Sequence, residues 1–115
     1  MTRPERRSSA VLPEMRVVWS PRAIDRVVEI AAYIAQDSPA TARERVERLF
    51  DHVDTQLAAF PLSGKPARDV DADDARELVF ESYRVFYDVG ETVEILTVRC
   101  GRELIDADEL RSGSA

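Results

Sequence analysis

Residues 20–61 read SPRAIDRVVEIAAYIAQDSPATARERVERLFDHVDTQLAAFP, and this stretch decides the fold. It contains the same helix-start signal twice, as Ser20-Pro21 and as Ser38-Pro39. A serine hydroxyl accepts a hydrogen bond from a free N–H at a helix start, and proline suits the first helical position because the N–H it lacks would have no partner there. The stretch therefore predicts two helices with a short connection, which is an antiparallel αα-hairpin.

Apolar residues recur at helical spacing in both segments. The first helix should end around Asp37, and Pro61 and Gly64 should end the second. Charged residues fill the other positions, so each helix is expected to bury one face. The apolar positions are Ile24, Val27, Val28, Ala31, Ile34 and Ala35 in the first helix, and Ala42, Val46, Leu49, Phe50, Val53, Leu57 and Phe60 in the second.

Strand-like runs flank the hairpin. Residues 16–19 are β-branched and aromatic, which predicts a short strand directly before the first helix. The polar stretch of residues 65–74 is expected to be a loop or a frayed edge strand. Three further strands, over residues 77–80, 83–89 and 92–100, have connections short enough for hairpin turns. The order of strand, helix, helix and three-stranded antiparallel meander predicts an α+β fold, with both helices packed on one face of an antiparallel sheet.

The length of 115 residues fits one domain. We expect residues 1–15 to form a disordered N-terminal tail, because they show no periodicity and include Pro4 and Pro13. The single domain should cover residues 16–111, with a last helical turn from Ile105 to Leu110. Residues 112–115 are expected to be a flexible end.

The composition excludes several classes of protein. An apolar fraction of 44% and a charged fraction of 33% are typical of a folded protein rather than a disordered one. The chain has one cysteine, so no disulfide can form within it. No apolar run is long enough to cross a membrane and no signal peptide is recognisable, so we expect a cytoplasmic protein. The net charge of −6 argues against a protein that simply coats nucleic acid.

No cofactor and no metal site is predicted. The acidic cluster between Asp69 and Asp74 lacks the spacing and the closing glutamate of an EF-hand, so we expect a solvated loop. His52 lies beside the apolar stripe of the second helix and is interpreted as a half-exposed boundary residue. Cys100 is expected to be a small packed side chain, and Trp19 and Phe60 are expected in the core.

Several short motifs follow one another along residues 16–110. Each is weak alone, but their order and spacing resemble the RelE/ParE family of bacterial growth-inhibiting toxins. The motifs are Val17-Val18-Trp19-Ser20-Pro21, Tyr33-Ile34-Ala35, Leu57-Ala58-Ala59-Phe60-Pro61, Arg76-Glu77-Leu78-Val79, Tyr83-Arg84-Val85-Phe86-Tyr87 and Val93-Glu94-Ile95-Leu96-Thr97-Val98-Arg99-Cys100-Gly101-Arg102.

The resemblance implies the toxin of a type II toxin–antitoxin pair, held inactive by a cognate antitoxin protein encoded beside it. ParE-like members of the family act on DNA gyrase and block replication. RelE-like members are endonucleases that cut mRNA on the ribosome. A third reading is an inactive member kept for antitoxin binding or for transcriptional autoregulation.

The residues that RelE-like nucleases use are only half present in this chain. Cleaving RNA without a metal needs a base, an acid and cations that hold the phosphate. The resemblance assigns the cationic role to Arg84 and Arg102, with Arg76 as a weaker candidate. The lysines before the central strand and the tyrosine near the C-terminus are missing, and Cys100 stands where many relatives carry a histidine. We therefore favour the ParE-like action on gyrase, which needs no catalytic group.

A purely structural role for the arginines stays open beside the catalytic one. Cross-strand ion pairs are common on exposed sheet faces, and the carboxylates within reach of Arg84 and Arg102 would be Glu77, Glu94 and Asp88.

The expected partner is the antitoxin, which would lay an amphipathic helix or a strand along the outer side of the hairpin or the sheet edge. Because this chain is acidic, we expect that interface to be more apolar than electrostatic, and strong salt dependence of antitoxin binding would contradict this. No membrane partner and no sequence-specific DNA binding by the toxin alone are expected.

Overall fold

The structure is a computed structural model, and it describes residues 14–67 and 75–101. Several predictions lie outside these residues. They are the N-terminal tail up to residue 13, the acidic loop of residues 69–74, the last helical turn of residues 105–110, the flexible end and the position of Arg102.

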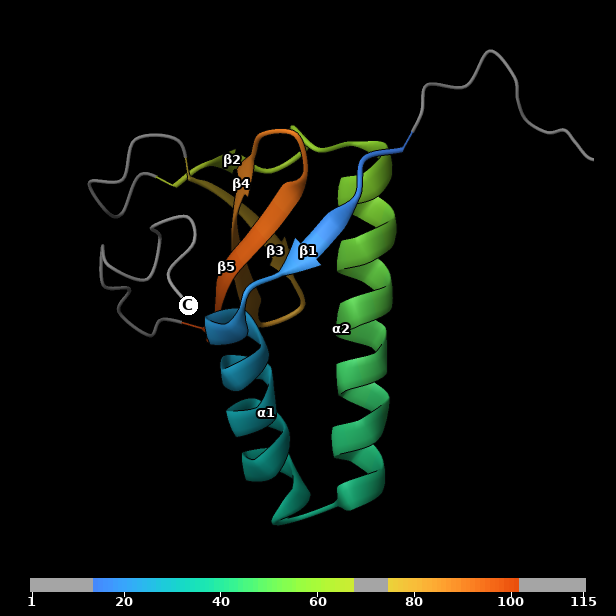
Figure 1. The fold of residues 1–115 in the computed structure, drawn as a ribbon. Helices are drawn as coiled ribbons and strands as arrows, with labels where there is room; N and C mark the ends of the chain where they lie inside the picture. The colour runs from blue at the N-terminus through green and yellow to red at the C-terminus, as the bar shows by residue number, and fades with distance from the viewer. Residues whose placement is uncertain (1–13, 68–74, 102–115) are drawn as a thin grey trace, which may run out of the picture.

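A helical hairpin stands against one face of a five-stranded sheet (Figure 1). The hairpin consists of α1 (Pro21–Ala35) and α2 (Pro39–Ala59). The strands are β1 (Val17–Trp19), β2 (Lys65–Pro66), β3 (Arg76–Phe80), β4 (Tyr83–Val89) and β5 (Val93–Cys100). The predicted α+β fold is confirmed, including the hairpin and the meander of β3, β4 and β5. No helix in the described part of the chain is long and apolar enough to cross a membrane.

Both helices begin at the predicted serines. The Ser20 hydroxyl accepts a hydrogen bond from the Ala23 N–H, and the Ser38 hydroxyl accepts one from the Thr41 N–H, each over 3.1 Å. Ser20 is buried, and its hydroxyl also donates to the Leu96 carbonyl over 3.0 Å. The start of α1 is thereby tied to the middle of β5.

The strand order is β1-β5-β4-β3-β2, and β1 runs parallel to β5. The expectation of a wholly antiparallel sheet is wrong at this strand pair, whereas β3–β4 and β4–β5 are antiparallel. The hairpin is the reason. It returns the chain to the start of β1, where the Met15 N–H donates to the Ala58 carbonyl over 3.0 Å. A meander of three strands that starts at this end brings its third strand, β5, alongside β1 in the same direction.

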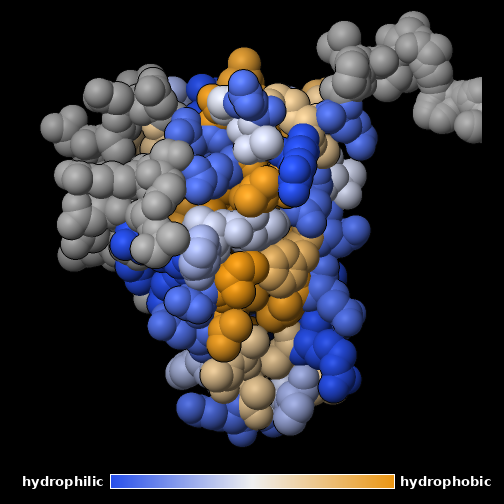
Figure 2. All heavy atoms as spheres, viewed as in Figure 1, coloured by the Kyte–Doolittle hydropathy of each residue, from blue (hydrophilic) through white to orange (hydrophobic). Residues whose placement is uncertain are grey.

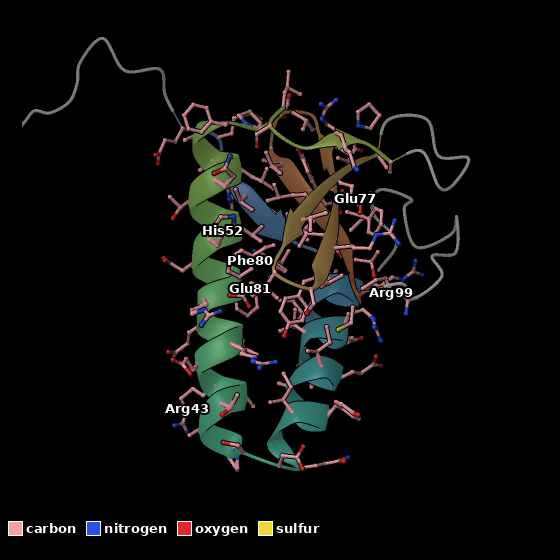
Figure 3. All side chains as sticks on the ribbon, turned by 180° about the vertical axis from the view of Figure 1, so that it is seen from behind. Arg43, His52, Glu77, Phe80, Glu81 and Arg99 are labelled. Atoms are coloured by element: carbon pink, nitrogen blue, oxygen red, sulfur yellow. The ribbon has the colours of Figure 1, made fainter. Side chains whose placement is uncertain are left out.

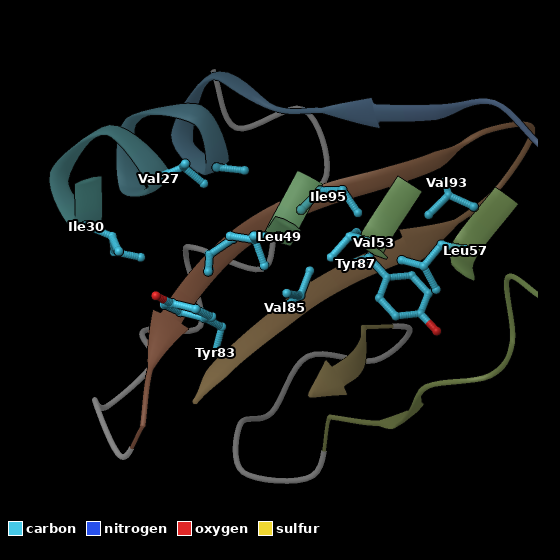
Figure 4. Close-up of a cluster of buried hydrophobic side chains, with 12 residues drawn as sticks. Val27, Ile30, Leu49, Val53, Leu57, Tyr83, Val85, Tyr87, Val93 and Ile95 are labelled. Atoms are coloured by element: carbon cyan, nitrogen blue, oxygen red, sulfur yellow. The ribbon is translucent and has the colours of Figure 1, made fainter. Parts of the chain in front are cut away.

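The main core lies between the hairpin and the sheet (Figure 4). One face of α2 meets the side chains that alternate along β4 and β5, as the strand period requires. The buried members are Ala23, Val27 and Ile30 from α1, Leu49, Val53 and Leu57 from α2, and Tyr83, Val85, Tyr87, Val93, Ile95 and Val98 from the sheet.

Two details of the predicted core are wrong. Phe60 is 63% exposed, because it follows the last residue of α2 and the backbone there has left the helical conformation (φ −134°, ψ 73°). Ile24 and Val28 are also exposed, because α1 carries more apolar residues than one buried face can hold. Trp19 is partly buried, with its ring edge-on to Phe50 at 4.5 Å between centroids.

A second, smaller cluster lies on the other face of the sheet. It consists of Phe86, Leu96, Ala67 and Ala75, all buried. A register shift after Phe86 creates it: Phe86 pairs with Thr97 but Tyr87 pairs with Ile95, so β5 has one extra residue there. The sheet centre is therefore apolar on both faces, which agrees with the lack of a polar face in the sequence of β4.

The turn after α2 is held by close packing against Tyr87. The Gly64 N–H donates to the buried Tyr87 hydroxyl over 2.9 Å. A Cβ on Gly64 would lie 2.6 Å from that hydroxyl and 2.6 Å from the Glu77 carbonyl oxygen. Glycine is thus required at position 64, because the backbone there passes close to the Tyr87 side chain of β4 and to the Glu77 carbonyl of β3.

We expect Gly64→Ala to lower the free energy of unfolding by about 1–3 kcal/mol, because the added methyl must displace backbone and an aromatic ring. Gly90→Ala is the matched control, since no heavy atom lies within 4 Å of a Cβ at that position. Urea unfolding followed by circular dichroism measures the difference. Equal stability of the two variants would contradict the packing described for Gly64.

Candidate functional sites on the sheet and the hairpin

Arg84 lies on the sheet face that the hairpin leaves uncovered. Its neighbours Tyr83 and Val85 belong to the main core, and side chains alternate along a strand, so Arg84 and Phe86 extend to the opposite face. Directly across the β4–β5 pair, Arg84 is opposite Arg99. This face therefore brings two arginines into one row of the sheet.

The guanidinium of Arg84 is taken up by contacts within the sheet. Its Nε donates to the Glu77 carboxylate over 2.7 Å, and its Cζ lies 5.1 Å from the centroid of the Phe86 ring. Glu77 is only 7% exposed. One of the structural partners expected for Arg84 is thus the partner it has, and the ion pair is largely withdrawn from water.

Arg99 was not among the residues expected at the site. Figure 3 shows Glu77 on the sheet and Arg99 near the end of β5, beside the first turn of α1. Like charges directly opposite one another are unfavourable. The Glu77 carboxylate offsets this repulsion, because it pairs with Arg84, the residue opposite Arg99. The sequence does contain a signal for this pair of arginines, because Arg84 is the middle residue of Tyr83–Val85 and Arg99 is the middle residue of Val98–Cys100. It could be read only once the strand register was known.

Arg76 is not brought to the same place as Arg84. It sits opposite Tyr87, three positions along β3 from Val79, the residue opposite Arg84. Its Nη2 donates to the carbonyls of Leu62, over 3.1 Å, and Gly64, over 2.5 Å. In this structure Arg76 holds the turn after α2.

The candidates for proton transfer lie elsewhere or are engaged. His52 on α2 is half-buried and stacks on the Phe80 ring, with centroids 4.2 Å apart. Cys100 is half-buried against the main core, as expected for a packed side chain. Among residues 14–67 and 75–101 no three His, Cys, Asp or Glu side chains gather as a metal site would require. Within this part of the chain the sheet face holds the two arginines of one row, and Arg84 is already paired with Glu77.

The hairpin and the strand β1 before it offer two surfaces of a different character. One, here called the apolar strip, consists of Val18 of β1 and of Ile24 and Val28 of α1, which are 37%, 39% and 59% exposed. Figure 2 shows hydrophobic residues gathered in a band between α1 and α2, with hydrophilic residues on either side.

The other surface is a hollow of about 480 Å³, here called the hairpin pocket. It lies between the second half of α1, the first half of α2, and the adjoining ends of β4 and β5. Its lining residues are Arg26, Glu29, Ile30, Tyr33, Ile34, Arg45, Ser82, Tyr83 and Cys100.

Comparison with known proteins identifies the family to which this chain belongs. The family model described as "ParE toxin of type II toxin-antitoxin system, parDE" matches residues 17–105. Putative toxin Y4kP from Sinorhizobium fredii (strain NBRC 101917 / NGR234) is 42% identical over 85 residues, which cover 72% of this chain and 84% of that protein.

Two solved structures are similar in fold. The chromosomal ParDE toxin–antitoxin system from P. aeruginosa gives a TM-score of 0.65 at 20% identity, covering 77% of this chain and 98% of that one. The toxin–antitoxin complex RelBE2 from Mycobacterium tuberculosis gives 0.58 at 18% identity, covering 83% and 98%.

A helical hairpin on one face of a small mixed sheet is the α+β fold that this chain shares with those two solved chains. By the family model and the 42% identical relative, the chain belongs to the ParE toxin family of type II toxin–antitoxin systems.

We expect Arg84→Met to lower the free energy of unfolding by about 3 kcal/mol, because it leaves the Glu77 carboxylate buried without its partner. The double variant Arg84→Met/Glu77→Leu should regain most of that loss, since neither charge remains. Urea unfolding of the parent, both single variants and the double variant completes the thermodynamic cycle. Additive effects of the two substitutions would show that the pair contributes nothing to folding.

Proposed function

We propose that this toxin inhibits growth by binding DNA gyrase through its surface, without catalysing a reaction, and that a cognate antitoxin neutralises it. The observation that carries the proposal is the engagement of Arg84, the best candidate for a catalytic cation, in a buried ion pair with Glu77. The description of the matching family, which names parDE, supports the same choice. Such a target would place the protein in the cytoplasm.

A RelE-like mRNA endonuclease is the second candidate. The row formed by Arg84 and Arg99 is the observation in its favour, because two guanidinium groups on one sheet face suit a phosphate backbone. General acid–base chemistry is what this reading lacks. Within the described part of the sheet face, no histidine or tyrosine lies next to that row, and the one lysine there, Lys65, is one row away, opposite the Glu77 that already pairs with Arg84. An inactive member that only binds its antitoxin is the remaining alternative.

The antitoxin is the partner that the family membership supports, and the hairpin is where we place it. The hairpin pocket lies there, and two of the three aliphatic side chains of the apolar strip belong to α1. Burial of such surface supplies most of the free energy in tight protein association. We therefore expect antitoxin affinity to depend only weakly on salt, and steep salt dependence would contradict an apolar interface.

Induced expression without the antitoxin distinguishes the three readings. A gyrase inhibitor should cause filamentation and the SOS response while translation continues, because blocked replication leaves ribosomes working. Pulse labelling of protein and primer extension on mRNA provide the measurement. An immediate stop in translation with cut mRNA would establish the nuclease instead, and unaffected growth would leave the inactive member.

Substitution of Arg102, whose role rests on the family resemblance, tests catalysis directly. We expect Arg102→Ala to inhibit growth and purified gyrase as strongly as the parent, because a surface inhibitor needs no phosphate-holding cation there. Gyrase supercoiling assays and growth curves measure this. A loss of roughly a hundredfold or more in toxicity, the scale expected when a catalytic group is removed, would favour the nuclease.

A further inference from the structure

The hairpin pocket combines an apolar wall with an arginine that has no partner among the residues the structure describes. Ile30, Ile34 and Tyr83 supply apolar wall, and Tyr33 stands at the pocket while being 75% exposed. At about 480 Å³ the hollow lies within the range of roughly 300–1,000 Å³ that is usual for ligand sites. Exposed tyrosine and arginine beside such a hollow are the residue types that most often dominate binding energy.

The charges around the pocket are not equivalent. Arg26 pairs with Glu29 over 2.5 Å, and its Nε donates to the Val98 carbonyl over 3.0 Å. Arg48, one turn along α2, pairs with Glu81 in the turn between β3 and β4. Arg45 has neither a hydrogen bond nor an ion pair with any residue of the described ranges. The lining therefore holds two arginines and one glutamate, a surplus of one positive charge on a chain whose net charge is −6.

We propose that this pocket anchors the antitoxin through an acidic amphipathic segment, which seats an apolar side chain against Ile30 and Tyr33 and places a carboxylate beside Arg45. This inference rests on the proposed function for the existence of the antitoxin. Charge complementarity selects the occupant, since Arg45 is the cation in the pocket that the carboxylates of the described residues leave available. The negative charge of the rest of the chain disfavours a broadly acidic partner, so the complementary acid is confined to the segment over the pocket.

A matched pair of variants tests the role of Arg45. Arg43 lies on the same helix and is also exposed, but it does not line the pocket. Figure 3 shows it on the side of α2 that faces away from α1. Arg45→Glu and Arg43→Glu make the same change in net charge. With the protein encoded by the adjacent reading frame as the probe, we expect Arg45→Glu to weaken binding about tenfold or more and Arg43→Glu to change it less than about threefold. Equal effects of the two variants on the dissociation constant would overturn the proposal.

Cys100 reports on the same pocket independently. It lines the hollow and is the single cysteine of the chain, so intact-mass measurement of alkylation in this chain follows one thiol. We expect the adjacent-frame protein to slow alkylation of Cys100 about tenfold or more, because a seated segment covers the pocket. A complex in which Cys100 reacts at its free rate, or one that Val28→Asp disrupts while Arg45→Glu does not, would place the partner on the apolar strip and overturn the assignment.

Growth measurements keep this test separate from the proposed function. If the parent arrests growth but its complex leaves Cys100 reactive, the pocket assignment fails and the toxin proposal stands. If the parent does not arrest growth but the complex protects Cys100 and depends on Arg45, the toxin proposal fails and the pocket assignment stands. The absence of any complex with the adjacent-frame protein would count against both.

Discussion

The hairpin can cover only one face of the sheet, and much of the remaining structure follows from this constraint. Alternate residues of β4, namely Tyr83, Val85 and Tyr87, point into the main core under the helices. The residues between them must be accommodated on the face that neither α1 nor α2 covers. Phe86 there joins Leu96 in a small second cluster, and Arg84 pairs with Glu77. A buried charge needs such a partner, because its desolvation is otherwise costly.

The same constraint explains why the charged side chains of the sheet are engaged in contacts that stabilise the fold. A group that transfers protons must be free to change its charge, but Glu77 is nearly inaccessible and already bound to Arg84. Arg76 is likewise used, since it holds the carbonyls of the turn after α2. Arg76, Arg84 and Glu77 in the described sheet thus stabilise the fold.

The hairpin, by contrast, has more apolar surface than it can bury internally. Ile24 and Val28 remain exposed beside Val18, and Tyr33 remains exposed at the pocket. Ordered helices present these side chains without the entropy loss that a loop would incur on binding. If the proposed function holds, binding to both an antitoxin and a target gains affinity from such a preorganised surface.

The sequence by itself determined the features that depend on close neighbours along the chain. The helix starts at Ser20 and Ser38, the helical spacing and the short hairpin connections all involve residues a few positions apart. Family membership also followed from the order of motifs. Tertiary structure alone decided the direction of β1, the exposure of Phe60 and Ile24, and the meeting of Arg84 with Arg99. These features depend on strand register and on which helix face is buried. Both are set by contacts between residues that are distant in sequence, and the spacing of residues along the chain does not reveal such contacts.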